Sequence, residues 1–375
     1  MKSEWKTSTI GAACSLVTDG SHSSPKSVES GEYMVSVKDF TEYGFDFTSC
    51  RRISSDDYET LKRNGCVPEQ GDILIGKDGA RYFEDIIIYR QPERPALLSS
   101  IAILRCNKEE IQPEFLYYTL RTPGFKQDVR DNYGSGSAIP RIILKDFKRM
   151  PISYPSLEVQ KQITAVLSIL DQRIQANAKI NDNLQQQTQA IYASVFVDNA
   201  DPAWQQGHLS DLVTVRYGKD HKKLADGIYP VYGSGGIMRY VERPLYDKES
   251  VLIPRKGTLN NVMYVNQPFW SVDTMFYTEM RMPNVAKFVY HFVKAKDLAS
   301  MNAGSAVPSM TTDILNAMEV AIPPASALEE FELLVAPMYK AMQENDAQSK
   351  ILADLRDTLL PKLMSGEIDV SGINL

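Results

Sequence analysis

One long stretch of this chain occurs twice, and this internal repeat constrains the fold more than any other feature of the sequence. The residues from Gly136 to Asp198 return without a gap, 168 positions later, as the residues from Gly304 to Gly366. The agreement is strongest in Gly136-Ser-Ala-Ile-Pro140 and its copy, Gly304-Ser-Ala-Val-Pro308. A repeat of this length predicts a chain built from two equivalent halves.

The later part of each repeat carries apolar residues at alternating steps of four and three, the spacing of the a and d positions of a coiled coil. Each half therefore contains a long helix whose narrow apolar stripe must pack against another helix. We predict that the two helices pair as an antiparallel coiled coil; the alternative is two amphipathic helices that each pack on their own domain. The predicted seam comprises Ile163, Leu167, Leu170, Ile174, Asn177, Asn181, Leu184 and Ile191 in the first helix and Phe331, Val335, Met338, Met342, Asn345, Leu352, Leu359 and Leu363 in the second.

Polar residues interrupt both seams near the middle, at Asn177 and Asn181 in the first copy and at Asn345 and Ser349 in the second. An unpaired buried amide costs roughly 1 to 3 kcal/mol, so helix alignments that mismatch these layers are disfavoured. In an antiparallel pair the polar layers would meet near the centre. Pro337 should kink the second helix or mark its start, because proline lacks a backbone donor.

The composition is that of an ordinary globular protein, with 375 residues, 43% hydrophobic and 23% charged residues. No apolar run is long enough to span a membrane and the N-terminus lacks the apolar core of a signal peptide, so we expect a cytoplasmic protein without membrane contact. The four cysteines lack paired spacing, which predicts reduced thiols that bind no metal; they are Cys14, Cys50, Cys66 and Cys106.

The net charge of -6 is unevenly distributed. Residues 1–156 carry -1, residues 157–200 carry -1, residues 201–324 carry +1 and residues 325–375 carry -5. The C-terminal segment thus holds most of the acidic excess. Any DNA would have to meet local basic clusters on the two larger segments.

The chain order is domain, helix, domain, helix, with expected boundaries at residues 1–155, 156–200, 201–324 and 325–375. Prolines at 155, 323 and 324 support these boundaries, because a residue before proline avoids helical geometry. The repeat extends weakly into the domains, where strand-like and helical stretches correspond in pairs. These pairs are 72–75 with 250–253, 100–105 with 271–277, 113–120 with 285–292 and, as closing strands, 149–155 with 317–323.

Known catalytic patterns are missing from the sequence. Gly71-Asp-Ile-Leu-Ile-Gly-Lys-Asp78 resembles a phosphate-binding loop, but its interior is a predicted strand and Asp78 replaces the hydroxyl that should bind magnesium. We find no nucleophile elbow, zinc helix, dinucleotide fingerprint, adenine-methyltransferase signature or acidic nuclease cluster, and the four histidines are scattered. We therefore predict recognition without catalysis and without a bound metal or cofactor.

The candidate recognition residues are basic, amide and hydroxyl side chains in or near the predicted loops. Arginine and lysine suit guanine edges and phosphates, and asparagine suits adenine. Any one of these side chains could instead be a solvated surface residue. The Gly136–Pro140 turn and its copy are weaker candidates for DNA contact, because such a segment is more often a structural turn. The candidates are Lys77, Arg81, Arg141, Lys145, Lys148, Lys219, Lys222, Lys223, Arg239, Arg255, Lys256, Thr258, Asn260 and Asn261.

Five helical stretches of the chain carry a family resemblance: Pro155–Ile163, Leu170–Ile174, Asn181–Leu184, Ala190–Asp198 and Leu359–Ile368. They resemble the conserved regions of type I restriction-modification specificity subunits. Two stretches of the second domain, Tyr229–Gly236 and Leu252–Thr258, are similar to one class of target recognition domain, whereas the first domain matches only loosely. The resemblance implies an α+β fold, in which two globular α/β target recognition domains are separated by two long conserved helices related by a pseudo-two-fold.

The same resemblance implies that each domain recognises one half of a split, asymmetric double-stranded DNA target, while the helices set the spacing. Two modification subunits would dock along the helices and supply S-adenosylmethionine-dependent methylation. Restriction subunits would add ATP- and magnesium-dependent translocation and cleavage. None of this chemistry is expected in the chain itself.

Two other interpretations remain open at this point. A non-catalytic coiled-coil scaffold that binds other proteins would fit the acidic total charge, and a self-contained nuclease or methyltransferase would need motifs that the sequence lacks. Identical seams also permit pairing between two chains. We predict pairing within one chain, because both copies are present.

Overall fold

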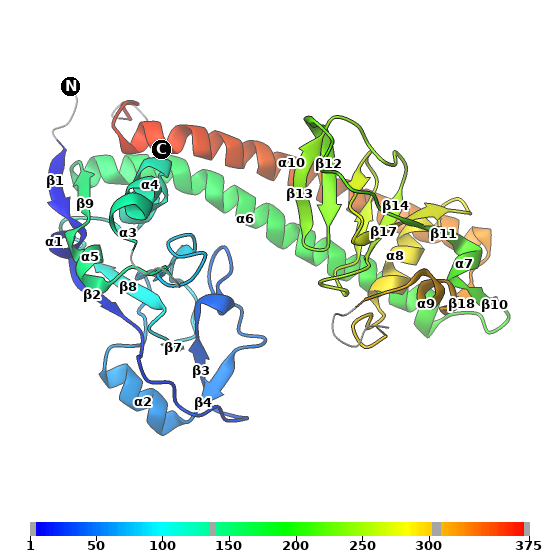
Figure 1. Cartoon of the computed structure of the whole chain (residues 1–375), viewed down its shortest axis with the longest axis horizontal. Coiled ribbons are helices and arrows are strands. Elements are labelled where there is room, and N and C mark those ends of the chain that lie inside the picture. The colour runs from blue at the N-terminus through cyan, green and yellow to red at the C-terminus, as the bar shows by residue number, and fades with distance from the viewer. Residues whose placement is uncertain (1–4, 135–139, 302–308, 371–375) are drawn as a thin grey trace. The chain divides into compact units, whose positions relative to one another are not determined.

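The computed structural model describes residues 5–134, 140–301 and 309–370 (Figure 1). The chain forms two compact units: unit 1 comprises Met1–Ala176 with Gln348–Leu375, and unit 2 comprises Asn177–Ala347. Each unit therefore combines one globular domain with parts of both long helices. This grouping follows spatial contact, whereas the expected boundaries at 155, 200 and 324 follow the chain order.

Unit 1 begins with three small sheets. Their strand orders are β1-β9, β2-β8-β5-β6 and β4-β3-β7. The strands are β1 (Lys6–Thr9), β2 (Cys14–Asp19), β3 (Glu32–Val35), β4 (Arg51–Ile53), β5 (Ile73–Gly76), β6 (Ile86–Ile88), β7 (Ala96–Leu97), β8 (Ile101–Cys106) and β9 (Pro151–Tyr154). The helices are α1 (Ile10–Ala13), a 3-10 turn (Val37–Asp39), α2 (Ser55–Arg63), α3 (Pro113–Arg121), α4 (Pro123–Asn132) and α5 (Leu144–Arg149).

Unit 2 has the same three sheets in the same order. Their strand orders are β10-β18, β11-β17-β14-β15 and β13-β12-β16. The strands are β10 (Gln205–His208), β11 (Val213–Tyr217), β12 (Asp226–Gly233), β13 (Gly236–Val241), β14 (Ser250–Pro254), β15 (Met263–Val265), β16 (Trp270–Ser271), β17 (Met275–Met280) and β18 (Glu319–Ile322). The helices are α7 (Leu209–Leu212), α8 (Ala286–Lys294) and α9 (Thr312–Asn316).

The two domains correspond strand by strand, so the repeat covers much more of the chain than the sequence similarity does. The four-stranded sheet of unit 1, β2-β8-β5-β6, corresponds to β11-β17-β14-β15 of unit 2, and in both sheets neighbouring strands are antiparallel. Helices α2 and α4 are additions of unit 1. The paired stretches predicted from sequence lie in corresponding strands and helices, which confirms an internally duplicated fold.

Apolar runs explain the central strands. All four residues of β5, Ile-Leu-Ile-Gly, are buried, as are all five of β14. A strand covered on both faces needs apolar side chains in every position, which is why these runs do not alternate. Proline at the start of α3 suits the first helical turn, where its missing N–H leaves no acceptor unpaired.

The long helices are α6 (Leu157–Ala193), which ends in a π-helical turn (Ser194–Asp198), and α10 (Ala325–Met364). They lie side by side (Figure 1). Each helix also belongs to the core of its neighbouring domain: Leu167 packs in the unit 1 core and Phe331 in the unit 2 core. Pro337 was expected either to kink the second helix or to mark its start. The second alternative is wrong, because α10 begins at Ala325 and continues through Pro337.

The contacts between α6 and α10 show that the helices are antiparallel. In unit 1, Asp171 contacts Arg356. In unit 2, the Asn181 amide donates to the backbone oxygen of Met342, and the Asn345 amide donates to Asn181 Oδ1 at 2.8 Å. The polar layers therefore meet, as the antiparallel arrangement predicts. Every predicted seam residue is buried or half-buried.

Candidate nucleic-acid interface

In unit 2, two loops leave the same edge of the four-stranded sheet. Strands β11 and β14 flank β17, and both are antiparallel to it. Tyr217, the last residue of β11, pairs with Phe276, and Pro254, the last residue of β14, pairs with Met275. The loops 218–224 and 255–261 therefore begin next to each other, separated only by the start of β17.

Backbone contacts hold the first loop against the sheet. The Gly218 N–H donates to Met275 O at 3.0 Å, and the Lys219 N–H donates to Ser271 O at 2.8 Å. The Trp270 indole N–H donates to Lys219 O at 2.8 Å. Gly218 must be glycine, because a Cβ there would lie 2.0 Å from the backbone oxygen of Val272. The direction of this loop is thus set by its close approach to the neighbouring sheet.

The second loop is fixed against the tip of the β12–β13 hairpin. Arg255 donates its N–H to Thr274 O at 2.9 Å, and the Asn261 side chain donates to Ser234 O at 2.7 Å. Gly257 has φ +86, a conformation that favours glycine, and a Cβ on it would lie 2.7 Å from Ser234 Oγ. Both loops and the hairpin tip therefore form one continuous edge.

The structure brings most predicted site residues of unit 2 to this edge. Four lysines and Thr258 are exposed, and these lysines make no ion pair with another described residue; they are Lys219, Lys222, Lys223 and Lys256. The Arg255 guanidinium lies over the Tyr217 ring, 5.3 Å from its centroid. Near it, the Asp220 carboxylate accepts a hydrogen bond from the Lys222 N–H, which lowers the pKa of Asp220.

The other three predicted residues of unit 2 make contacts that shape the loops. Arg239 donates to Leu224 O at 2.8 Å and to Asp226 Oδ1 at 2.9 Å. Asn260 donates to Asp297 Oδ1 at 3.1 Å and accepts from the Ala299 N–H. Together with the Asn261 contact, these bonds hold the three side chains in place, although Arg239 Nε is buried without a hydrogen-bond partner among the described residues. Their role in binding remains a prediction.

Unit 1 has the corresponding edge, where β2 and β5 flank β8. Asp19, the last residue of β2, pairs with Ala102, and Gly76, the last residue of β5, pairs with Ile101. The predicted site residue Lys77 follows β5 directly, but only 6% of it is exposed. Its ammonium group lies 3.3 Å from Asp19 Oδ2 and 3.6 Å from Asp78 Oδ1. These ion pairs hold the Lys77 ammonium group inside the protein.

The remaining predicted residues of unit 1 are spread over the domain. Arg81 forms an exposed ion pair with Asp85 at 2.7 Å. Arg141 is exposed, and its backbone forms an isolated antiparallel β-bridge with Asp78, so Arg141 lies beside the Lys77 edge. Lys145 and Lys148 are exposed on α5, and the backbone of Lys148 packs against Gly11, before the start of β2 and away from Asp19. The candidates at Gly136–Ile139 and Gly304–Pro308 lie outside the described residues.

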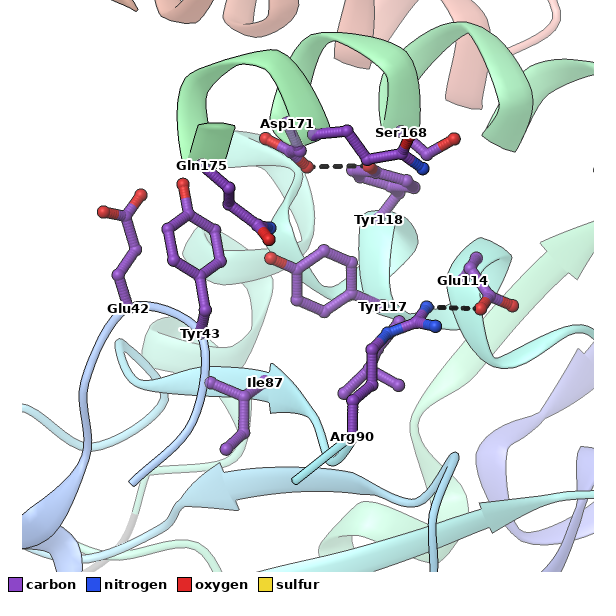
Figure 2. A pocket seen from close by; sticks show the side chains of 12 residues that line it. Glu42, Tyr43, Ile87, Arg90, Glu114, Tyr117, Tyr118, Ser168, Asp171 and Gln175 are labelled. Atoms are coloured by element: carbon purple, nitrogen blue, oxygen red, sulfur yellow. Dashed lines mark hydrogen bonds and ion pairs between the residues drawn. The ribbon is translucent and has the colours of Figure 1, made fainter. Parts of the chain in front are cut away.

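A cavity of about 220 Å³ in unit 1 was not foreseen from the sequence (Figure 2). It lies between α3, α6, β6 and the loop that carries Tyr43. Figure 2 shows Tyr118 directed at Asp171 and Arg90 directed at Glu114, with distances of 2.7 and 2.6 Å. Burial, together with Asp171, raises the pKa of Tyr118.

Two pairs of polar side chains in this cavity thus bond to each other, whereas the buried Tyr43 hydroxyl has no hydrogen-bond partner among the described residues. Asp171 also accepts from Arg356 on α10 at 2.8 Å, which makes a buried ion pair between the two helices. No sequence signal predicted this pair, because Thr188 and not arginine stands at the position of the first copy that corresponds to Arg356. The cavity lies between the domain and α6.

The described residues contain no cluster of three or more His, Cys, Asp or Glu side chains suited to a metal ion. Nor is any helix in the described part of the chain long and apolar enough to cross a membrane. What the site offers is an exposed, basic loop edge on one domain and a closed, ion-paired edge on the other.

Comparison with known protein families gives one match that covers most of the chain. The family model described as "Type I restriction modification DNA specificity domain" matches residues 2–186 and 202–355. The two matched regions correspond to the two copies seen in the fold.

Individual relatives agree with the family match. The MjaIX type I restriction enzyme specificity subunit of Methanocaldococcus jannaschii is 24% identical over 70% of this chain and 71% of its own length. The HindI specificity subunit of Haemophilus influenzae is 20% identical over 80% of this chain and 87% of its own length. The crystal structure of the type I restriction-modification S subunit from M. genitalium aligns with 96% of both chains, with a TM-score of 0.60 and 18% identity. This last similarity shows a shared fold.

Proposed function

Because this chain belongs to the family of type I restriction-modification DNA specificity domains, we propose that it is the specificity subunit of such a system and that each unit binds one half of a bipartite DNA target. The duplicated sheet edge is the observation that carries this proposal. In each domain, two loops leave the ends of the strands that flank a central strand. Two equivalent binding edges in one chain suit a target with two parts.

The two edges differ in chemistry, which supports an asymmetric target. In unit 2 the edge carries exposed lysines and Arg255, whereas in unit 1 Lys77 is buried against Asp19. Exposed lysines supply the sequence-independent attraction to phosphates. Loops that differ in their side chains would then recognise different base pairs in the two halves.

We assign the spacing of the two half-sites to α6 and α10. Helix α6 has 37 residues, which corresponds to a length of about 55 Å at 1.5 Å per residue. The polar contacts of Asn181 and Asn345 and the buried pair of Asp171 and Arg356 oppose sliding of one helix along the other. A fixed register would give the target a fixed gap.

The chemistry belongs to other subunits in this proposal. Two modification subunits would dock along the helices and supply S-adenosylmethionine for adenine methylation, and restriction subunits would use ATP and magnesium. The chain itself would act without catalysis, in the cytoplasm where the DNA lies. The absence of a catalytic motif from the sequence supports this division.

A map of methylated adenines in the source cell, with this gene intact and deleted, tests the proposal. We expect one split motif with a fixed gap to disappear on deletion. An unchanged map in cells that express an active modification subunit would refute it and favour a protein-binding scaffold, which the net charge of -6 would suit. A salt titration of duplex binding adds a second criterion, since neutralising Z phosphates gives a log-log slope near -0.9Z.

A further inference from the structure

The two domains place different side chains at one equivalent position of the binding edge. Strand pairing defines the equivalence: Asp19 and Ile75 both pair with Ala102 in unit 1, and Tyr217 and Ile253 both pair with Phe276 in unit 2. Lys77 and Arg255 stand two residues after Ile75 and Ile253, so they correspond to each other. Asp19 and Tyr217 likewise correspond.

Unit 1 neutralises its cation at this position. Lys77 lies 3.3 Å from Asp19 Oδ2 and is buried, and His22 Nε2 lies 3.3 Å from the same carboxylate oxygen. A buried ammonium group that is paired in this way would have to give up its partner before it could bind DNA. Breaking a buried pair is costly, because it leaves an uncompensated charge.

Unit 2 leaves its cation available. The Arg255 side chain has one long hydrogen bond, from Nη1 to Asp273 O at 3.4 Å, and no ion pair with a described residue. Its guanidinium lies over Tyr217, which is 52% exposed. The backbone of Arg255 is held at both ends, because its N–H donates to Thr274 O and its oxygen accepts from the Met310 N–H.

We propose that Arg255 recognises a guanine in the half-site bound by unit 2 and that Tyr217 is the residue that positions its guanidinium group. A guanidinium fork donates two parallel hydrogen bonds to guanine O6 and N7, the commonest specific contact in the major groove. An arginine on a rigid loop loses less side-chain freedom when it makes such a contact. Unit 1 recognises its half-site without this contact.

Contact of Arg255 with a phosphate is the competing possibility. The edge already carries Lys219, Lys222, Lys223 and Lys256 for that purpose, and lysine binds phosphate as a point charge. Stacking on an aromatic ring, in contrast, fixes the plane of a guanidinium group. A contact that depends only on charge does not need this orientation, whereas a two-pronged contact with a base does. This contrast between arginine and lysine provides the test.

The inference rests on the proposed function, and its test begins from the methylation map of the wild-type complex. Cells carry the complete system with Arg255→Lys, which keeps the charge and removes the fork. We expect a guanine in one half of the motif to be lost or relaxed, while the other half and the gap are unchanged. Binding of the assembled complex to the wild-type duplex should weaken about 5- to 150-fold, since a bidentate pair provides about 1 to 3 kcal/mol.

A modified duplex then identifies the contacted atom. Replacing that guanine by 7-deazaguanine removes the N7 acceptor, so it should weaken binding of the wild-type complex and leave the Arg255→Ala complex, which lacks the donor, unaffected. Tyr217→Phe keeps the ring and should behave like the wild type, whereas Tyr217→Ala should relax the same guanine without changing the salt dependence. The matched control is Arg281→Lys, because the Arg281 N–H bonds Leu212 O beside the start of β11, at the other end of the sheet. This control should keep the full motif.

The outcomes distinguish failure of the guanine contact from failure of the proposed function. If Arg255→Ala keeps the complete motif and the same sensitivity to 7-deazaguanine, the guanine contact is refuted while the specificity function stands. If Arg255→Ala weakens every duplex equally and lowers the salt slope by about 1, Arg255 is a phosphate contact and the inference also fails. A wild-type map without any gene-dependent motif would instead refute the proposed function.

Discussion

Loss of the arginine from the buried pair between α6 and α10 should strongly destabilise unit 1. The perturbation is Arg356→Met, which keeps much of the apolar side-chain length and removes the charge. In the wild type, Arg356 Nη1 donates to Asp171 Oδ1 at 2.8 Å, and Tyr118 donates to Asp171 Oδ2 at 2.7 Å. The variant would leave the Asp171 charge with Tyr118 as its only hydrogen-bonding neighbour among these groups.

The expected magnitude follows from burial. The side chains of Asp171 and Arg356 are 8% and 11% exposed, so water screens their interaction poorly. Removing one partner of a buried pair typically costs about 3 to 5 kcal/mol. The free energy of unfolding of an ordinary domain is about 5 to 15 kcal/mol, so this loss would be a large part of it.

Urea unfolding of the full chain at pH 7, followed by circular dichroism, measures the effect. The double variant Asp171→Leu with Arg356→Met replaces both charges by apolar groups and should recover most of the lost stability. The control is Arg216→Met, which removes an exposed ion pair with Glu279 and should cost at most about 1 kcal/mol. The reasoning is refuted if Arg356→Met costs no more than this control, or if the double variant is as unstable as the single one.

Three further predictions concern other parts of the chain. Burial and the charge of Lys294 lower the pKa of His291 from 6.5 to about 4. The free energy of unfolding should therefore be largest above pH 6.5 and fall by about 3 kcal/mol as the pH decreases to 4. Urea unfolding at several pH values should show this decrease, and His291→Gln should reduce it. Gly218→Ala places a Cβ 2.0 Å from a backbone oxygen and should lower the melting temperature and weaken duplex binding, whereas Gly235→Ala has open space and should be neutral in stability. Asn345→Leu removes the donor to Asn181 and should lower the free energy of unfolding in urea by about 1 to 3 kcal/mol. The double variant Asn181→Leu with Asn345→Leu leaves neither amide unpaired and should lose less; a double variant at least as destabilised as the single one would contradict this.

Local periodicity explains why the helical part of the fold could be predicted. An apolar stripe with steps of four and three depends on residues a few positions apart, and so it is visible in one segment at a time. The antiparallel pairing and the meeting of the polar layers followed from comparing the two copies. The prediction that Pro337 starts the second helix failed because Leu328, Phe331 and Val335, which precede the proline, are buried in the unit 2 core, and their packing offsets one missing backbone hydrogen bond.

The candidate site was only partly predictable, as Lys77 and Arg255 illustrate. Both are cations that follow a buried strand, and in the sequence they look alike. Which of them is available depends on the residue at the end of another strand, Asp19 in one domain and Tyr217 in the other. Strand pairing brings these partners together, and it is not visible in the spacing of residues along the chain.

The amino-acid sequence by itself determined that this protein has two equivalent halves and two long paired helices, because both depend on repeated local patterns. Its role in DNA specificity followed from the resemblance of those helical stretches to a known family. Only the tertiary structure decided which charges face solvent and which are neutralised. The electrostatic state of Lys77, Arg255, Asp171 and Arg356 is set by partners distant in sequence, at separations of a few ångströms. Coulomb energies and desolvation act over those distances in space, whatever the separation along the chain.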